Sequence, residues 1–400
     1  MIIRLIKISL LLMILSSCAS NTPEARTLQV TEVASTVPPS DTPIPTLPPP
    51  TETTPTTVTS TTELVAFGPD NFPAHINPLT AKNVSNPMLL ERRPLAIKVQ
   101  IFPRGQRPPW GVSVADIVYD FYQNFGLTRF HTIFYGTDAE VVGPIRSARL
   151  ADIILVEMYE SIFAFGSAEQ RTYSRLFNKE FSDQLVVEGY ANCPPMCRVD
   201  PNGYNYLVTN TAELSKYATE KGVDNSRQNL DGMTFNQDAS PGGQPGQQLF
   251  VRYSIGAYLQ WNYDVNSGRY LRFQDAQEAP NLADEAYSAL TDRLTGQQIA
   301  ADNVIVLAVP HKYAYNTHPG PNEVIEIMLS GSGPAYAFRD GQVFQTTWNW
   351  SEAYSVLYLS LPDGTAYAYK PGNTWYQVVG QSTQIQNDTA GIYRFEFRIP

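Results

Sequence analysis

The stretch VGPIRSARLADIILVEMYE (Val142–Glu160) combines a stiff turn, two arginines and an apolar run. Gly143 and Pro144 favour a turn, because glycine permits close backbone approach and proline fixes its own φ angle. The apolar residues that follow are typical of a helix, and Ser147 is well placed to cap its first turn. The segment therefore predicts a helix that is capped by Ser147 and preceded by a rigid turn.

Strand patterns lie on both sides of this helix. Residues 94–101, 128–136 and 161–166 read as strands, 115–124 fit a strand or a helix, and 211–222 predict a second helix that ends at Gly222. The mixture lacks the regular βαβ period of a Rossmann fold. We therefore expect the α+β class, with a mixed-sheet N-terminal domain with helices over residues 72–236.

A Gly/Gln/Pro-rich break, residues 236–248, separates this region from a second one. Residues 258–273 read as a hairpin around Asn266-Ser267-Gly268, and 303–310, 323–331, 333–348 and 374–379 supply further strands and turns. The sequence thus predicts a β-rich C-terminal domain over residues 249–400.

The N-terminus has the pattern of an exported lipoprotein. Arg4 and Lys7 precede a short apolar segment, residues 8–15, which is too short to span a bilayer comfortably. Leu15-Ser16-Ser17-Cys18 then resembles a bacterial lipobox, although an ordinary secretory signal would also fit the apolar segment. We expect residues 1–18 to be a lipoprotein signal peptide and Cys18 to carry the lipid that anchors the protein to the extracytoplasmic face of the cell membrane.

Residues 19–68 are rich in Pro, Thr and Ser and have few large apolar side chains. Such a composition cannot bury a core, so we expect a disordered stalk between the anchor and the folded part.

Apart from Cys18, the chain has two cysteines, Cys193 and Cys197, in the sequence CPPMC. A pair outside the cytoplasm tends to oxidise, and the two prolines between the cysteines help the backbone to bend. A metal site is the alternative, but no histidine lies nearby in the sequence. The pattern favours a structural disulfide and no metal site.

The formal net charge is -10, and no run of Lys or Arg occurs. Nucleic-acid binding needs a basic face, so we expect no nucleic-acid partner. A single basic pocket remains compatible with this composition.

Several motifs together resemble the YerB-like family of bacterial lipoproteins, known by a domain of unknown function, DUF3048, in two parts. The motifs of the first part are RPLAIKV (93–99), ADIVYD (115–120), GLTRF (126–130) and VGPIRSAR (142–149). The second part contributes WNYDVNSGRYLR, DNVIVL, LSGSGPAYAFRDGQV and GNTWYQVV. The resemblance covers residues from about 90 to 380 and implies a two-part α+β fold at the cell envelope, without a settled activity.

Three positions depart from the family's pattern. Asp120 stands where relatives usually have Glu, and Phe165 and Tyr204-Asn205 stand where they often have histidines. These changes argue against a histidine-based enzyme. We expect no cofactor, and we favour a protein that is not an enzyme.

The arginines of the opening stretch suggest an anion pocket. Arg146, Ser147 and Arg149 would lie at the positive end of a helix, and the arginine fork suits carboxylate or phosphate. Arg129, Asp116 and Asp120 are further charges in apolar segments, and we include them in the candidate site. The alternative is structural: Arg149 would pair with Asp152, and Arg146 with Asp116 or Asp120. The candidate ligand is a cell-wall component or another envelope protein.

A second functional hypothesis is a cell-wall glycan hydrolase that uses Asp116 and Asp120 as paired carboxylates. It requires both carboxylates to be exposed in one cleft. Ser147 and Ser167 do not lie in a G-x-S-x-G motif, and His311 and His318 alone are a weak metal signal. The aromatic residues Trp348, Trp350, Tyr354, Tyr358 and Trp375 could stack on sugars, but such residues more often pack in a core.

Overall fold

The computed structural model describes residues 66–189, 192–200, 206–318, 323–350 and 355–399. The expected signal peptide, Cys18 and most of the expected stalk lie outside these residues, as do Tyr204, Asn205 and Tyr354. The last residues of the expected stalk take part in the fold, because Phe67 forms a backbone bridge with Phe235. No helix among the described residues is both long and apolar enough to cross a membrane.

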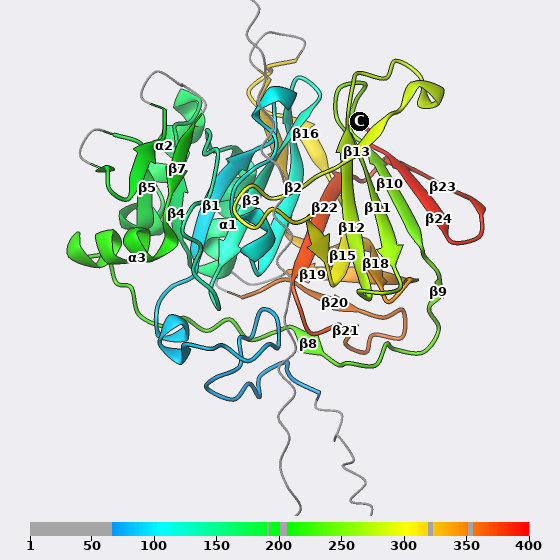
Figure 1. Cartoon of the computed structure of the whole chain (residues 1–400), viewed down its shortest axis with the longest axis horizontal. Helices are drawn as coiled ribbons and strands as arrows, with labels where there is room; N and C mark the ends of the chain where they lie inside the picture. Colours follow the sequence, from blue (N-terminus) through cyan, green and yellow to red (C-terminus); the bar gives the residue numbers. More distant parts are fainter. Residues whose placement is uncertain (1–65, 190–191, 201–205, 319–322, 351–354, 400) are drawn as a thin grey trace, which may run out of the picture. The chain divides into compact units, whose positions relative to one another are not determined.

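Strands dominate the described part of the chain, and three α-helices accompany them (Figure 1). The helices are α1 (Leu150–Tyr159), α2 (Gln170–Phe177) and α3 (Thr211–Glu220). Short 3-10 helices occupy Pro87–Glu91, Arg104–Gln106, Val112–Val114, Glu180–Gln184 and Leu282–Asp284. The fold is therefore sheet-rich, with less helix than the α+β expectation.

The larger sheet has eleven strands within the described residues and takes strands from both halves of the chain. Its order is β20 (Tyr358–Ser360), β19 (Gln342–Trp350), β18 (Gly331–Arg339), β15 (Asn303–Val309), β22 (Thr374–Gly380), β2 (Ile117–Asn124), β3 (Leu127–Phe134), β1 (Leu95–Gln100), β4 (Ile162–Phe165) and β5 (Leu185–Val187), and β9 (Gln244–Pro245) pairs with β19. The segment 115–124, which fitted helix or strand, is thus the strand β2.

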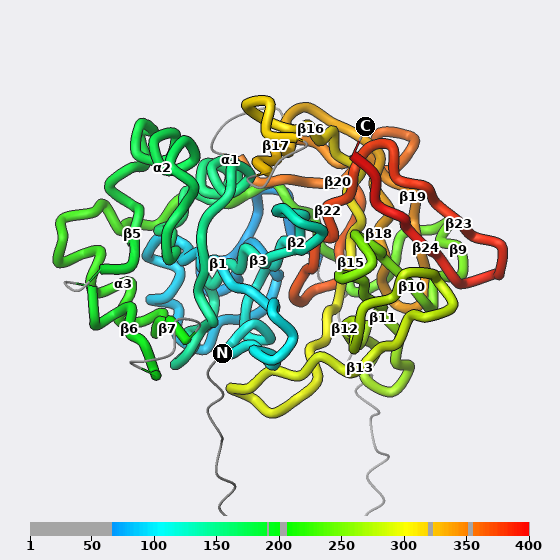
Figure 2. The backbone as a smooth tube through the Cα atoms, turned by 90° about the horizontal axis from the view of Figure 1, so that it is seen from above, coloured from blue at the N-terminus to red at the C-terminus, as the bar shows by residue number. Residues whose placement is uncertain are grey.

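A second sheet contains β13 (Tyr287–Ala289), β12 (Arg269–Asp275), β11 (Tyr258–Asp264), β10 (Gln248–Arg252), β24 (Ile392–Glu396) and β23 (Gln384–Thr389), with β14 (Ala300–Ala301) beside β12. Figure 2 shows β24, near the C-terminus, beside β10, with which it pairs in parallel. Three two-stranded sheets complete the fold: β16 (His311–Tyr313) with β17 (Ile325–Ile327), β21 (Ala368–Tyr369) with β8 (Thr234–Phe235), and β6 (Met196–Arg198) with β7 (Leu207–Thr209).

The central strands of the larger sheet are buried on both faces. Strand β2 pairs in parallel with β22, and this pairing joins the two halves of the chain. One face of these strands packs on the second sheet, where Trp375 of β22 meets Trp261 of β11 at a ring distance of 5.1 Å. The opposite face packs on α1, where the hydroxyls of Tyr119 and Tyr159 lie 2.8 Å apart. Burial on both faces explains why β2 shows an apolar run rather than a clean alternation.

Candidate functional site

The segment 146–148 is extended, and the helix starts later than the sequence suggested. Arg146 donates its backbone N–H to Lys98, Ala148 donates to Ser167, and Gly166 donates to the carbonyl of Arg146. These bonds hold the segment between β1 and residues 166–168. Helix α1 therefore begins at Leu150 with Arg149 as its N-cap residue, and the prediction that Ser147 caps the helix was wrong.

A carboxylate already occupies the positive end of this helix. Asp152 Oδ2 accepts the backbone N–H of Arg149 at 2.6 Å, and its other oxygen contacts two buried side chains. An acid in the first turn neutralises the exposed amides and the helix dipole. The start of α1 is thus not open to an anion, so a ligand site in this region must rest on side chains.

Two of the predicted arginines, Arg129 and Arg146, line the same pocket of about 390 Å³. Arg129 belongs to β3 and lies opposite Gln100 of β1, and Arg146 donates from Nε to Gln100 Oε1 at 2.6 Å. Gln123 also lines the pocket, is only 4% exposed, and has an Oε1 atom without a hydrogen-bond partner among the described residues. The ends of β1 and β2, the start of β3 and the segment 146–148 therefore bring two cationic and two amide side chains to one cavity.

Three arginines line the pocket although the chain as a whole is acidic. Its third arginine, Arg104, is paired with the buried carboxylate of Asp275 at 2.6 Å. The acidic residue that lines the pocket is Glu278, which is exposed. Arg129 and Arg146 are only partly exposed, so their charges are screened less than those of surface arginines.

The other predicted residues of the opening stretch do not line this pocket. Arg149 donates from its guanidinium to the carbonyls of Ala148 and Ser147, and burial lowers its pKa to about 10. The Ser147 hydroxyl lies 3.0 Å from that of Ser167, and its carbonyl accepts from Arg129 at 2.8 Å. Ser147 therefore helps to position Arg129 through its backbone.

A buried ionic cluster lies next to the arginine pocket on the same face of the sheet. Its members Lys98 and His131 are paired across β1 and β3, two residues along from Gln100 and Arg129. Lys98 Nζ and His131 Nδ1 lie 2.9 and 2.8 Å from the same oxygen of Asp152, and all three side chains are fully buried. Burial lowers the pKa of Lys98 to about 7, against the opposing effect of Asp152, and burial also lowers the pKa of His131. Burial alone would raise the pKa of Asp152, but Lys98 and His131 outweigh it and lower the pKa to about 2.

Asp120 lies on the face of β2 that packs on the second sheet, and its contacts stabilise the fold rather than line a pocket. It is fully buried and accepts a hydrogen bond from Arg272 of β12 at 2.8 Å. The Arg272 guanidinium lies 5.1 Å from the ring of Trp261 and 5.2 Å from that of Trp375. Burial raises the pKa of Asp120, and Arg272 opposes that shift. This ion pair ties the second sheet to the larger one.

Asp116 lies in a different pocket of about 400 Å³. One oxygen accepts from Asn77 at 3.0 Å, and the other accepts the backbone N–H groups of Tyr135 and Gly136. Burial raises its pKa to about 6. Asp116 and Asp120 do not share a cleft, so the geometry that the hydrolase hypothesis required is not present.

The histidines and aromatic residues that the sequence suggested as further candidates are explained by packing and local hydrogen bonds. His311 is buried and bonds to the carbonyl of Val309, whereas His318 stacks on Tyr313 at 3.9 Å. No group of potential metal ligands occurs among the residues that the structure describes. The tryptophans at 348, 350 and 375 are core residues, and Tyr358 is 40% exposed.

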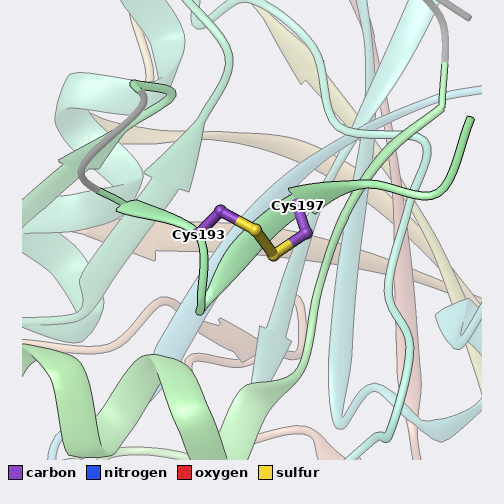
Figure 3. Close-up of a disulfide and its surroundings, with 2 residues drawn as sticks. All are labelled: Cys193 and Cys197. Carbon is purple, nitrogen blue, oxygen red and sulfur yellow. A yellow bond between two sulfur atoms is a disulfide. The ribbon is translucent and has the colours of Figure 1, made fainter. Parts of the chain in front are cut away.

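The cysteines Cys193 and Cys197 form a disulfide at the turn that leads into β6 (Figure 3). Strand β6 pairs with β7, and Thr209 of β7 forms a backbone bridge with Val142. The disulfide therefore lies in the hairpin next to the turn that carries Arg146.

Comparisons with known proteins agree with this architecture. Residues 79–224 match the model "Protein of unknown function (DUF3048) N-terminal domain", and residues 249–376 match the corresponding C-terminal domain. The chain belongs to the DUF3048 family. It is 27% identical over 321 residues to "Putative lipoprotein YerB" of Bacillus subtilis (strain 168). The alignment covers 76% of this chain and 88% of that protein.

The DUF3048 fold has a solved counterpart. The crystal structure of the Bacillus subtilis YerB protein is similar to this chain, with a TM-score of 0.60 and 23% identity. The similarity covers 76% of this chain and 96% of that one. At this level of identity the likeness concerns the fold.

Sequence reasoning missed several members of the site and its surroundings. Gln100 and Gln123 carry no local motif, and Arg104 lies in a loop. Lys98 was visible as a charge inside an apolar strand, and Arg272 as a charge inside the hairpin strand YLRF. A charged residue at a buried strand position is therefore the signal that could have located both ion clusters.

Proposed function

We propose that this DUF3048 protein is a lipid-anchored protein of the bacterial envelope that binds an anionic wall component through the pocket of Arg129 and Arg146. The observation that carries the proposal is the meeting of these two arginines with Gln100 and Gln123 in one cavity. The planar guanidinium of arginine suits a carboxylate or phosphate, which can accept two parallel hydrogen bonds from it.

The proposed anchor rests on the N-terminal sequence and on a relative. The sequence Leu15-Ser16-Ser17-Cys18 lies at the end of a short apolar segment, and the Bacillus subtilis relative is named "Putative lipoprotein YerB". A lipid on Cys18 would hold the protein at the membrane from its extracytoplasmic side. This location would put the pocket within reach of wall polymers.

The anchor is tested by metabolic labelling with a fatty-acid analogue in a bacterial host that processes lipoproteins. We expect the wild-type protein to be labelled and recovered with membranes, and Cys18→Ser to be unlabelled. An unlabelled wild-type protein would exclude the lipid anchor while leaving the pocket hypothesis intact.

The pocket is tested by calorimetric titration of the purified full chain with soluble muropeptides and, separately, with glycerol phosphate. Charge-assisted hydrogen bonds contribute about 1.5–3 kcal/mol each, so Arg129→Gln and Arg146→Gln should each weaken binding by roughly 10-fold or more. Arg171→Gln is the control, because Arg171 is an exposed arginine outside the pocket that pairs with Glu169.

The two probes distinguish the anion. Muropeptide binding that is weakened in the pocket variants, without glycerol phosphate binding, would identify carboxylates of the peptide stem. Glycerol phosphate binding that is weakened in the same variants would identify a phosphate polymer. If neither probe binds, or if the pocket variants bind as tightly as Arg171→Gln, the proposal is wrong.

A further inference from the structure

A third pocket, of about 500 Å³, is lined by strands of the larger sheet and by β24. Tyr336 of β18, Phe344 of β19 and Tyr393 of β24 line it. Residues 361–363, Pro241, Gly242 and Gln244 complete its walls. The Tyr336 ring also contacts Phe395 of β24 at 5.3 Å, so the two sheets hold this aromatic wall together. None of its lining residues lines the arginine pocket.

The Gly-rich break that the sequence suggested as a domain boundary forms one wall of this pocket. Residues 244–245 pair with β19 as strand β9, and Gly243 lies against the Phe344 ring. A Cβ atom at Gly243 would come within 2.6 Å of Phe344 Cζ, so a larger residue would displace the ring or the loop. Packing of this kind indicates a pre-formed pocket, as small-molecule sites usually are.

The polar groups of the pocket can both donate and accept hydrogen bonds. Gln345 is exposed and has no side-chain hydrogen bond to a described residue, and Gln244 uses only its Nε2 in a long contact to Gly242. Asp363 accepts from Thr365 through Oδ1. Tyr393, which is 7% exposed, adds a hydroxyl to the residues that line the pocket.

The charge of the pocket disfavours anions. No lysine or arginine is among the residues that line the pocket, and Asp363 is its charged side chain, so an anion would be unfavourable.

We infer that this aromatic pocket binds a neutral carbohydrate. The apolar face of a sugar ring can stack on Tyr336, because tyrosine offers an apolar ring with a polar tip. Sugar hydroxyls donate and accept, which matches the glutamine amides, the carboxylate and the tyrosine hydroxyls. The volume accommodates a ligand of about one or two sugar rings.

The test is a titration of the purified full chain with cellobiose and, separately, with N,N′-diacetylchitobiose. NMR spectra of the protein are recorded at each step to detect binding. A zwitterionic detergent is used, because a glycoside detergent would compete for the pocket. We expect saturable binding of at least one disaccharide, and binding at least 10-fold weaker in Tyr336→Ala and in Gln345→Ala. The second variant alters an exposed side chain, so it tests the pocket even if Tyr336→Ala fails to fold.

Two control variants test whether sugar binding depends on this pocket and not on another exposed tyrosine or on the arginine pocket. Tyr358→Ala removes an exposed tyrosine of the same sheet outside the pocket and should bind the sugar as the wild type does. Arg146→Gln should also leave sugar binding unchanged, so this result is independent of the anion proposal. The inference is overturned if no disaccharide binds, if Gln345→Ala and Tyr336→Ala bind normally, or if tetramethylammonium or a polyproline peptide binds in place of sugar.

Discussion

At the scale of single residues, the two fully buried carboxylates Asp120 and Asp152 are each paired with buried basic side chains. Asp120 faces Arg272 across the interface between the sheets, whereas Asp152 contacts Lys98 and His131 under helix α1. A buried charge without a partner is costly, whereas a complete pair approximately balances its desolvation. Each cluster therefore makes the fold sensitive to the loss of a single member.

The Asp120–Arg272 pair leads to the first prediction. Asp120→Asn leaves the Arg272 charge buried without an anion, so we expect the free energy of unfolding to fall by about 3–5 kcal/mol. Urea denaturation measures the change. Glu220→Gln is the control, because its pair with Lys216 is exposed and should contribute less than about 1 kcal/mol. Equal effects of the two substitutions would contradict this account.

His131 gives a prediction about pH. Burial lowers its pKa from the ordinary value of 6.5, so the unfolded chain binds more protons at this site as the pH falls below that value. Stability from neutral His131 is therefore present above about pH 6.5 and lost as the pH falls toward the lower pKa of the folded state. We expect His131→Gln to have a flatter dependence of unfolding free energy on pH between 6.5 and 5. An unchanged slope would show that His131 is not held neutral in the fold.

At the scale of elements, the hairpin of β18 and β19 depends on its turn. Asp340 and Gly341 both have positive φ angles, 52° and 70°, as a two-residue turn with right-handed twist requires. A Cβ at Gly341 would also lie 2.9 Å from the Tyr263 ring. We expect Gly341→Ala to lower the unfolding free energy by about 1–3 kcal/mol.

The control for this turn is Gly105→Ala. Gly105 does not have a positive φ angle, and a Cβ there would meet nothing within 4 Å. Thermal denaturation should separate the two variants clearly. A melting temperature of Gly341→Ala equal to that of Gly105→Ala would mean that the turn does not constrain the hairpin.

The sequence predicted the strands β1, β3, β4, β15 and β22, the hairpins of β11 with β12 and of β18 with β19, and the helices α1 and α3, because their patterns are local. Helix α2 and many of the shorter strands were not predicted. The start of α1 was misplaced, since the bonds of Arg146 and Ala148 to β1 and to Ser167 come from distant residues. The arginine pocket was half predicted. Arg129 and Arg146 were named, but Asp116, Asp120 and Arg149 lie elsewhere, because strand register decides which charges share a cavity.

At the scale of the whole described region, the larger sheet is continuous across both parts of the family match. Strand β2 from the first part pairs with β22 from the second over residues 117–121. We expect fragments 66–236 and 249–400 to be unfolded when produced alone, because each would expose a central strand edge and unpaired buried charges. NMR spectra measure this outcome, and a well-dispersed spectrum from either fragment would show that it folds independently.

The central claim is that Arg129 and Arg146 form an anion-binding pocket, and hydrogen exchange tests it most directly. Amide exchange of the full chain would be measured with and without saturating soluble muropeptide, in the wild type and in Arg146→Gln. The account predicts slower exchange in residues 127–129 and 143–148 of the wild type, and a much smaller effect in the variant at the same muropeptide concentration. Protection confined to other segments, or equal protection in Arg146→Gln, would contradict it.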